Sequence, residues 1–207
     1  MEEKKGKKSS PGKYMGIVAT LLVFTLLILA FFMPWWSYTV TDTSDDTVLT
    51  GDFSLNEVEF SLESEDSIST TTLTYAEDEE ISTTFQYTSW MVYISIILAF
   101  ISFILSILVL SKRTKRNTRM ATVVIFLTIV MLLVTAMYFM FSLPDALSTD
   151  TAGEIASFYG TDTVGSVEYA FAPTYGWFFL LASFVVMLLA IPPNCKSMGN
   201  NLGCLIS

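Results

Sequence analysis

The sequence predicts a membrane-embedded bundle of four α-helices that carries a small extracellular antiparallel β-sheet. Two observations lead to this fold class. The chain of 207 residues is 52% hydrophobic with a mean hydropathy of +0.56, which is well above the values of ordinary soluble domains. Its longest polar segment, residues 34–89, alternates apolar and polar residues with the two-residue period of half-buried strands.

Four apolar runs are long enough to cross the core of a bilayer, which takes roughly 20 helical residues. None of them contains Asp, Glu, Lys or Arg. The first run follows a lysine-rich start but lacks a small-residue cleavage site, so we expect a retained anchor and not a secretory signal. The predicted spans are residues 14–33, 90–110, 120–143 and 175–191.

Charge is divided unequally between the segments that connect these spans. All eleven Lys and Arg residues lie in the tail 1–13, the loop 111–119 and the tail 192–207. The segments 34–89 and 144–174 hold eighteen of the twenty Asp and Glu residues and no basic residue. Because positive residues in short loops resist translocation, we expect both termini and the loop 111–119 to be cytoplasmic, next to the anionic lipids of the inner leaflet.

The tryptophans fall at the predicted outer ends of the first, second and fourth spans. Indole is amphipathic and settles at the boundary between headgroups and hydrocarbon. We therefore expect an interfacial belt, and no ligand site, from Trp35, Trp36, Trp90 and Trp177.

Small residues recur in the second span at spacings of four, three and four residues. This spacing puts them on one helical face and lets a neighbouring backbone approach closely. We expect a helix-packing stripe, and the nine-residue basic loop favours a hairpin of the second and third spans. An alternative is that the same stripe is a homodimer face. Its members are Ser95, Ala99, Ser102 and Ser106.

The first outer segment, 34–89, predicts four strands. The first covers residues 36–41, and the second covers residues 53–62 with a shift of phase that indicates a bulge at Asn56 and Glu57. Leu73 and Tyr75 indicate the third strand, and the alternation within residues 81–87 indicates the fourth. Charged, turn-like clusters at 65–67 and 77–80 separate them.

The second outer segment, 144–174, predicts a short helix at 152–159 and one strand at 167–171. A single sheet built from both segments and resting on the outer ends of the helices is the most economical arrangement. Such a sheet has one apolar face that covers, or is covered by, another part of the molecule.

Thirteen acidic residues lie in the first outer segment. The simplest interpretation is a solvated, self-repelling surface that prevents edge-to-edge association of the sheet. A second interpretation is weak binding of a divalent cation by carboxylate oxygens, although no Asp-x-Asp-x-Asn-Gly loop is present.

Several classes of protein are excluded or disfavoured by composition. The chain has no histidine, so it has no His-dependent nucleophile system and no His-ligated metal. We find no glycine-rich phosphate loop, no nucleophile elbow and no cofactor motif. The basic residues are explained by membrane topology and not by binding of nucleic acid.

The two cysteines are too close to the C-terminus to form a disulfide framework. They are candidate lipidation sites: Cys195 lies beside the last span, and Cys204 lies in a C-terminal C-a-a-X pattern.

The chain combines cytoplasmic termini, four helices, a long strand-rich first outer loop with Trp35 and Trp36 at its start, a short basic inner turn, and a shorter second loop that adds a strand. This order resembles the claudin and peripheral-myelin-protein group of tetraspan proteins, although the Gly-Leu-Trp segment and extracellular cysteine pair of that group are absent. The resemblance implies a sheet displayed for lateral or cell-to-cell association.

We therefore expect a non-enzymatic membrane protein that associates with copies of itself or with another membrane protein as an accessory subunit. A component of a channel or transporter is one alternative, although no span carries an ionisable residue for coupling. An outward-facing sensor or cation-binding module is another alternative.

Overall fold

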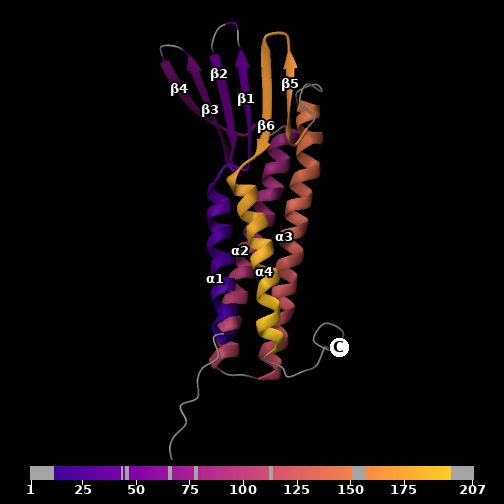
Figure 1. Cartoon of the computed structure of the whole chain (residues 1–207). Coiled ribbons are helices and arrows are strands. Elements are labelled where there is room, and N and C mark those ends of the chain that lie inside the picture. Colours follow the sequence, from indigo (N-terminus) through magenta and orange to yellow (C-terminus); the bar gives the residue numbers. More distant parts are fainter. Residues whose placement is uncertain are drawn as a thin grey trace, which may run out of the picture.

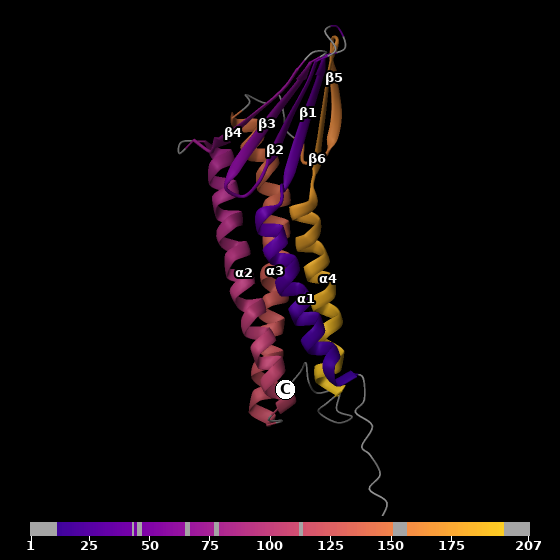
Figure 2. The ribbon, with the colours of Figure 1, turned by 90° about the vertical axis from the view of Figure 1, so that its left-hand side faces the viewer.

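The computed structural model describes residues 12–42, 44, 47–64, 67–76, 79–111, 114–150 and 157–196. Four long helices stand side by side, and a β-sheet rises from one end of them (Figure 1). The helices are α1 (Gly12–Phe32), α2 (Glu80–Ser111), α3 (Lys115–Asp150) and α4 (Tyr175–Lys196). The chain runs up α1, down α2, up α3 and down α4, so consecutive helices are antiparallel (Figures 1 and 2).

Each helix packs against two neighbours in the bundle. The most extensive pairs are α2 with α3 and α1 with α4, and the bundle is closed by α1 with α2 and α3 with α4. The expected hairpin of the second and third apolar runs is therefore present. Its turn, around Thr114, lies at the end of the bundle opposite the sheet (Figure 1).

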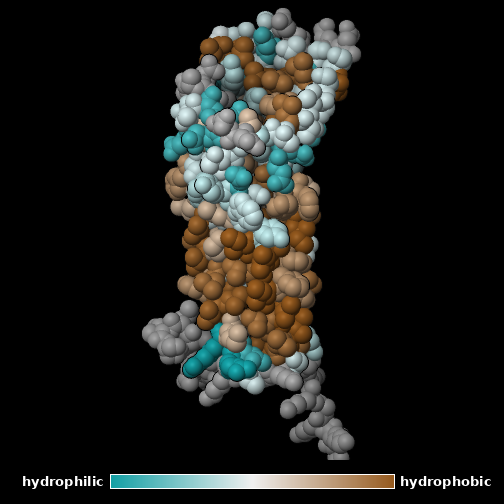
Figure 3. All heavy atoms as spheres, turned by 180° about the vertical axis from the view of Figure 1, so that it is seen from behind, coloured by the Kyte–Doolittle hydropathy of each residue, from teal (hydrophilic) through white to brown (hydrophobic). Residues whose placement is uncertain are grey.

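Three of the helices, α1, α2 and α3, are long and apolar enough to cross a membrane. In α4 the apolar segment with described side chains, Tyr175–Leu189, is shorter. Large apolar side chains are exposed all along the bundle and form a continuous hydrophobic belt with a hydrophilic patch at its lower end (Figure 3). An apolar surface of this extent indicates a membrane protein, because soluble monomers rarely expose such a patch.

At the end of the bundle that carries the sheet, α2 and α3 extend well beyond the predicted spans. The α2 helix begins at Glu80, so the predicted strand at residues 81–87 is wrong. Thr84, Phe85, Thr88 and Val92 are buried, and this spacing follows one face of a helix. The α3 helix continues through Pro144 to Asp150.

The sheet has six antiparallel strands in the order β4-β3-β2-β1-β6-β5. Segment 34–89 forms β1 (Trp36–Asp42), β2 (Thr47–Phe53), β3 (Glu57–Ser64) and β4 (Ser67–Thr74). Segment 144–174 forms β5 (Gly160–Val164) and β6 (Val167–Pro173), and β6 pairs with β1. One sheet built from both segments is therefore confirmed, as are the strands predicted at 36–41 and 167–171.

The predicted bulge at Asn56 and Glu57 is wrong, because the chain reverses there. Ser54 N and Ser54 Oγ donate to the Glu57 carbonyl at 2.9 and 2.8 Å, which closes a tight turn between β2 and β3. The predicted strand at 53–62 is therefore not one strand: it covers most of β3 but overlaps β2 only at Phe53. Strand β5 has no counterpart in the prediction. The predicted helix 152–159 lies largely outside the described residues, and residues 157–159 are not helical. The predicted turn residues 65–66 and 77–78 also lie outside the described part.

Candidate functional site

The four small residues of the predicted packing stripe are all buried inside the bundle: Ser95, Ala99, Ser102 and Ser106. Ser102 Oγ lies 3.3 Å from Thr128 Oγ1, and this hydrogen bond joins α2 to α3. Ser95 and Ser106 donate to carbonyl groups of their own helix. The stripe therefore packs within the chain, and its face is not open to a second copy.

Two of the tryptophans assigned to the lipid interface are buried in protein instead. Trp35 and Trp36 are both 0% exposed, so the interfacial-belt prediction is wrong for them. They lie where α1 ends and β1 begins, and the change of direction from bundle to sheet turns both indoles inward. Trp90 is 60% exposed on the side of the bundle, and Trp177 is half-buried against Phe158.

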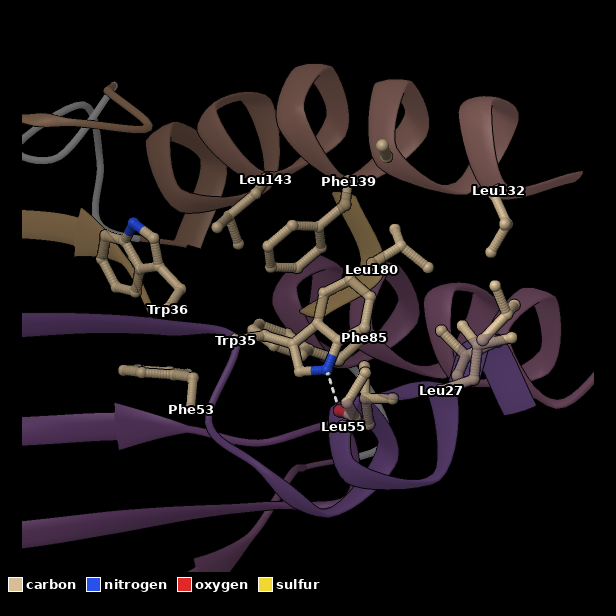
Figure 4. Packing of buried hydrophobic residues seen from close by; sticks show 14 of the residues in the cluster. Leu27, Trp35, Trp36, Phe53, Leu55, Phe85, Leu132, Phe139, Leu143 and Leu180 are labelled. Carbon is tan, nitrogen blue, oxygen red and sulfur yellow. Dashed lines mark hydrogen bonds between the residues drawn. The ribbon is translucent and has the colours of Figure 1, made fainter. Parts of the chain in front are cut away.

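Trp35 fills the centre of the junction between the helices and the sheet (Figure 4). Its Nε1 donates to the carbonyl of Ala30 at 2.6 Å, which satisfies an acceptor in the last turn of α1. Its ring makes a T-shaped contact with Phe139 from α3, with centroids 5.1 Å apart, and Phe139 makes another with Phe85 from α2 at 5.3 Å. Trp35 therefore contacts α1 and α3 directly, and Phe139 links it to α2.

The backbone on both sides of Trp35 ties the first strands to the last helix. Its N–H donates to the Phe53 carbonyl at 2.7 Å, and its carbonyl accepts from Thr174 N at 3.0 Å. Gly176 N donates to the Pro34 carbonyl at 2.7 Å. A Cβ atom at Gly176 would overlap the Trp35 indole, so the close approach of α4 requires glycine.

Trp36 begins the apolar face of the sheet. Its Nε1 donates to the Phe158 carbonyl at 3.0 Å, and its ring contacts Phe53 at 5.3 Å and Phe171 at 6.5 Å between centroids. Strands β1, β2 and β6 therefore meet through aromatic contacts, which add to the stability gained from buried area.

Tyr75 fixes the end of the sheet that leads into α2. Its ring stacks on Phe85 at 5.1 Å, and its hydroxyl donates to the Ser54 carbonyl at 2.6 Å. Burial, together with the nearby Glu57 carboxylate, raises the pKa of the Tyr75 hydroxyl. The hydroxyl therefore stays a donor at physiological pH.

The two faces of the sheet differ in chemistry. The apolar face continues beyond the junction with Tyr38, Phe60 and Leu62, which become more exposed with distance from the helices until Leu62 is 44% exposed. Gly51 lies opposite Tyr38 in the register, and a Cβ there would come within 2.6 Å of the tyrosine ring. The missing side chain leaves room for the ring, which packs between β2 and Phe60.

The polar face carries Ser and Thr together with carboxylates. Asp52 and Glu59 are cross-strand partners on it, and desolvation followed by the charge of Glu59 raises the pKa of Asp52. Near the strand tips, hydrogen bonds from the side chain and backbone of Ser44 lower the pKa of Asp42. Asp52 and Glu59 thus repel each other across the two strands, whereas Asp42 is stabilised in its charged form by Ser44.

The described residues contain no group of three or more Asp, Glu or Cys side chains placed to hold a metal ion. Of the candidate lipidation sites, Cys204 lies outside the described residues. Cys195 belongs to the last turn of α4, where the structure describes the backbone but not the side chain.

Strand β4 lies at one edge of the sheet. In the sequence, only Leu73 and Tyr75 indicated this strand. All eight of its residues are exposed, and it pairs with β3 alone. Its polar, threonine-rich sequence gives weak alternation, which is why the strand was indicated only at one end.

Comparison with known protein families finds no family that matches this chain, and comparison with curated proteins finds no match either.

Proposed function

We propose that this chain is a non-enzymatic integral membrane protein whose four helices span the bilayer and whose sheet mediates protein-protein association outside the membrane. The observation that carries the proposal is the joint at Trp35, where one buried cluster connects an apolar helical base to a six-stranded sheet. A joint of this kind holds the sheet in a fixed orientation, and a fixed orientation reduces the entropy lost when a partner binds.

Charge supports the proposed orientation. Eighteen carboxylates and no basic residue lie in segments 34–89 and 144–174, whereas all Lys and Arg residues belong to the segments 1–13, 111–119 and 192–207 that flank the opposite ends of the predicted spans. The exposed Trp90 and Tyr93 on α2 suit the outer headgroup level, with ring centroids 6.3 Å apart. The proposed position also places the basic residues on anionic inner-leaflet lipids.

The hydrogen bonds of the hydroxyl groups in the bundle favour association over transport. Thr128, Thr135 and Ser183 donate to carbonyl groups four residues earlier in their own helices. These hydroxyl groups satisfy their hydrogen bonds within their own helices, so they give no support to a polar pathway. The resemblance to the claudin and peripheral-myelin-protein group agrees with a role in association, either with copies of this chain or with another membrane protein.

Impermeant labelling of single cysteines in intact cells tests the orientation. In a background where Cys195 and Cys204 are replaced by serine, cysteine at Ser44 or Thr161 should be labelled. Cysteine at Thr114, in the turn between α2 and α3, should be labelled only after the membrane is opened. Labelling at Thr114 in sealed cells would contradict the four-span orientation.

Two measurements on the purified full chain test association against transport. Mild detergent should recover the protein as a complex, either with itself or with a second membrane protein, and crosslinks should map to the sheet. Proteoliposomes should show no more ion or solute flux than empty vesicles. Flux from an isolated monomer without a partner would overturn the proposal in favour of a channel.

A further inference from the structure

We infer that the exposed edge of β4 binds an extended, basic segment of a partner protein, which adds a seventh strand to the sheet. This inference deepens the proposed function, on which it rests, by naming the surface and the chemistry of the partner. It starts from the position of β4 at the end of the strand order.

The edge of β4 is regular and open. The register with β3 runs without interruption from Glu57↔Thr74 to Ser64↔Ser67, so the strand contains no bulge. Among the described residues, the backbone groups of 68–74 make no hydrogen bond outside the pairing with β3. A regular edge strand presents a row of free N–H and C=O groups, which is the template that an added strand requires.

The edge also lacks the usual protection. Natural proteins protect edge strands with Lys, Pro, bulges or short length. Strand β4 has eight residues, Ser67–Thr74, with no charged residue and no proline. The other edge, β5, has only five residues and carries Asp162. The sheet therefore has one protected edge and one edge that is open for pairing.

The neighbouring strand selects the charge of the partner. Glu57, Glu59 and Glu63 of β3 are exposed and stand beside Thr74, Thr72 and Ile68 of β4. An added strand would lie about 10 Å from β3, or two strand spacings, and only short side chains of β4 would lie between them on most of this face. Lys or Arg on the added strand would therefore reach toward these carboxylates across the β4 threonines.

A second copy of this chain is the less suitable occupant. The segments that form the sheet carry eighteen carboxylates and no basic residue, so two copies bring the same charge to the contact. An extended segment with alternating basic residues supplies both the backbone pairing and the opposite charge.

Hydrogen exchange on the full chain in neutral detergent tests the inference, with synthetic ten-residue peptides as probes. A peptide of alternating Thr and Lys should slow exchange of the amides in 67–74, and should leave those in 160–164 of β5 unchanged. An alternating Thr and Glu peptide, and the Thr and Lys peptide with a central proline, should not slow it. Raising the salt should weaken the binding, because the charges lie about one Debye length apart, roughly 8 Å at physiological ionic strength.

Two matched variants check the location. Thr72→Lys places a positive charge opposite Glu59 on the polar face and should weaken binding of the Thr and Lys peptide by roughly five-fold, the equivalent of about 1 kcal/mol. Thr161→Lys makes the same change on exposed β5 and should leave binding unchanged. Circular dichroism of each variant should match that of the parent.

The outcomes separate this inference from the proposed function. The inference would be overturned if the Thr and Glu peptide slowed amide exchange in β4 as much as the Thr and Lys peptide does, or if a saturating amount of the Thr and Lys peptide slowed it not at all. It would also be overturned if Thr72→Lys and Thr161→Lys weakened peptide binding equally. Concentration-dependent protection of β4 in the free protein would also overturn it, because a second copy would then occupy the edge. If native complexes are recovered but the peptide does not slow amide exchange in β4, the proposed function stands and only the inference is overturned.

Discussion

Asp150, the last residue of α3, accepts a hydrogen bond from the backbone N–H of Ile81 in the first turn of α2, at 2.8 Å. Its other carboxylate oxygen lies 3.3 Å from Glu80 N. The first N–H groups of a helix have no partner within the helix, and a carboxylate there also suits the positive end of the helix dipole. The end of α3 thus caps the start of α2 from a position sixty-nine residues away.

Replacing this cap gives the first prediction. Asp150→Ala should lower the free energy of unfolding in detergent by about 1 kcal/mol, within the range measured for lost helix caps. Asp145→Ala, on an exposed position of the same helix, is the matched control and should change stability little. Equal losses in the two variants would mean that the bonds to Ile81 and Glu80 add no stability.

Trp35→Phe should destabilise the junction between bundle and sheet. The substitution removes the donor to the Ala30 carbonyl, which is buried, and leaves that acceptor without its partner. Loss of a buried hydrogen-bond partner costs about 1–3 kcal/mol. Trp90→Phe, at a side chain that is 60% exposed, should cost far less. Thermal unfolding of both variants, followed by near-ultraviolet circular dichroism, measures the difference.

Gly176→Ala should destabilise the protein even though alanine is favoured over glycine in a helix by up to about 1 kcal/mol. The added Cβ would overlap the Trp35 indole and lie 2.9 Å from the Pro34 carbonyl oxygen, which is backbone and cannot move away cheaply. Overpacking of this kind costs about 1–3 kcal/mol. Tyr175→Ala removes a side chain that is 69% exposed and serves as the comparison. A rise in unfolding temperature for Gly176→Ala would show that the contact with Trp35 relaxes without cost.

The sequence predicted the helices and the strands at 36–41 and 167–171 because periodicity is a local property, and the errors occur where distant residues decide. Residues 81–87 alternate as a strand would, yet Ile81, Phe85 and Thr88 also follow a helical face. The helix is formed because this segment runs directly into the apolar part of α2 and because Asp150 caps it. A cap supplied from another helix leaves no signal near residue 81.

The tryptophans show a second limit of prediction from the sequence. An indole at the end of an apolar span fits a lipid interface and a protein junction equally well, since both places combine apolar surroundings with a hydrogen-bond acceptor. Only the return of β6 and α4 past Pro34 determines that Trp35 is covered. Likewise, a hairpin turn and a bulge produce the same shift of phase at 54–57, and only the pairing of β2 with β3 distinguishes them.

The raised pKa of Asp52 makes stability depend on pH in a defined direction. Desolvation, and then repulsion from Glu59 in the opposite register position, disfavours the charged form in the folded sheet. A group whose pKa is higher in the folded state than in the unfolded state contributes stability that is fully present below the unfolded pKa, about 3.9 for Asp, and is lost as the pH rises through the folded value. At neutral pH the ionised Asp52 therefore opposes folding.

Asp52→Asn should for this reason stabilise the protein at pH 7, by roughly 0.2–1 kcal/mol, the usual range for a cross-strand pair. The gain should shrink as the pH falls, because a growing fraction of the parent carboxyl is then protonated and no longer repels Glu59. Glu168→Gln is the control: it removes a carboxylate from β6 whose register partners, Thr41 and Thr163, are uncharged, and it should give no such gain. The two variants are compared by urea unfolding in detergent at pH 7 and pH 4. A gain for Asp52→Asn that is the same at both values would show that it comes from the amide's own hydrogen bonds and not from the repulsion between Asp52 and Glu59.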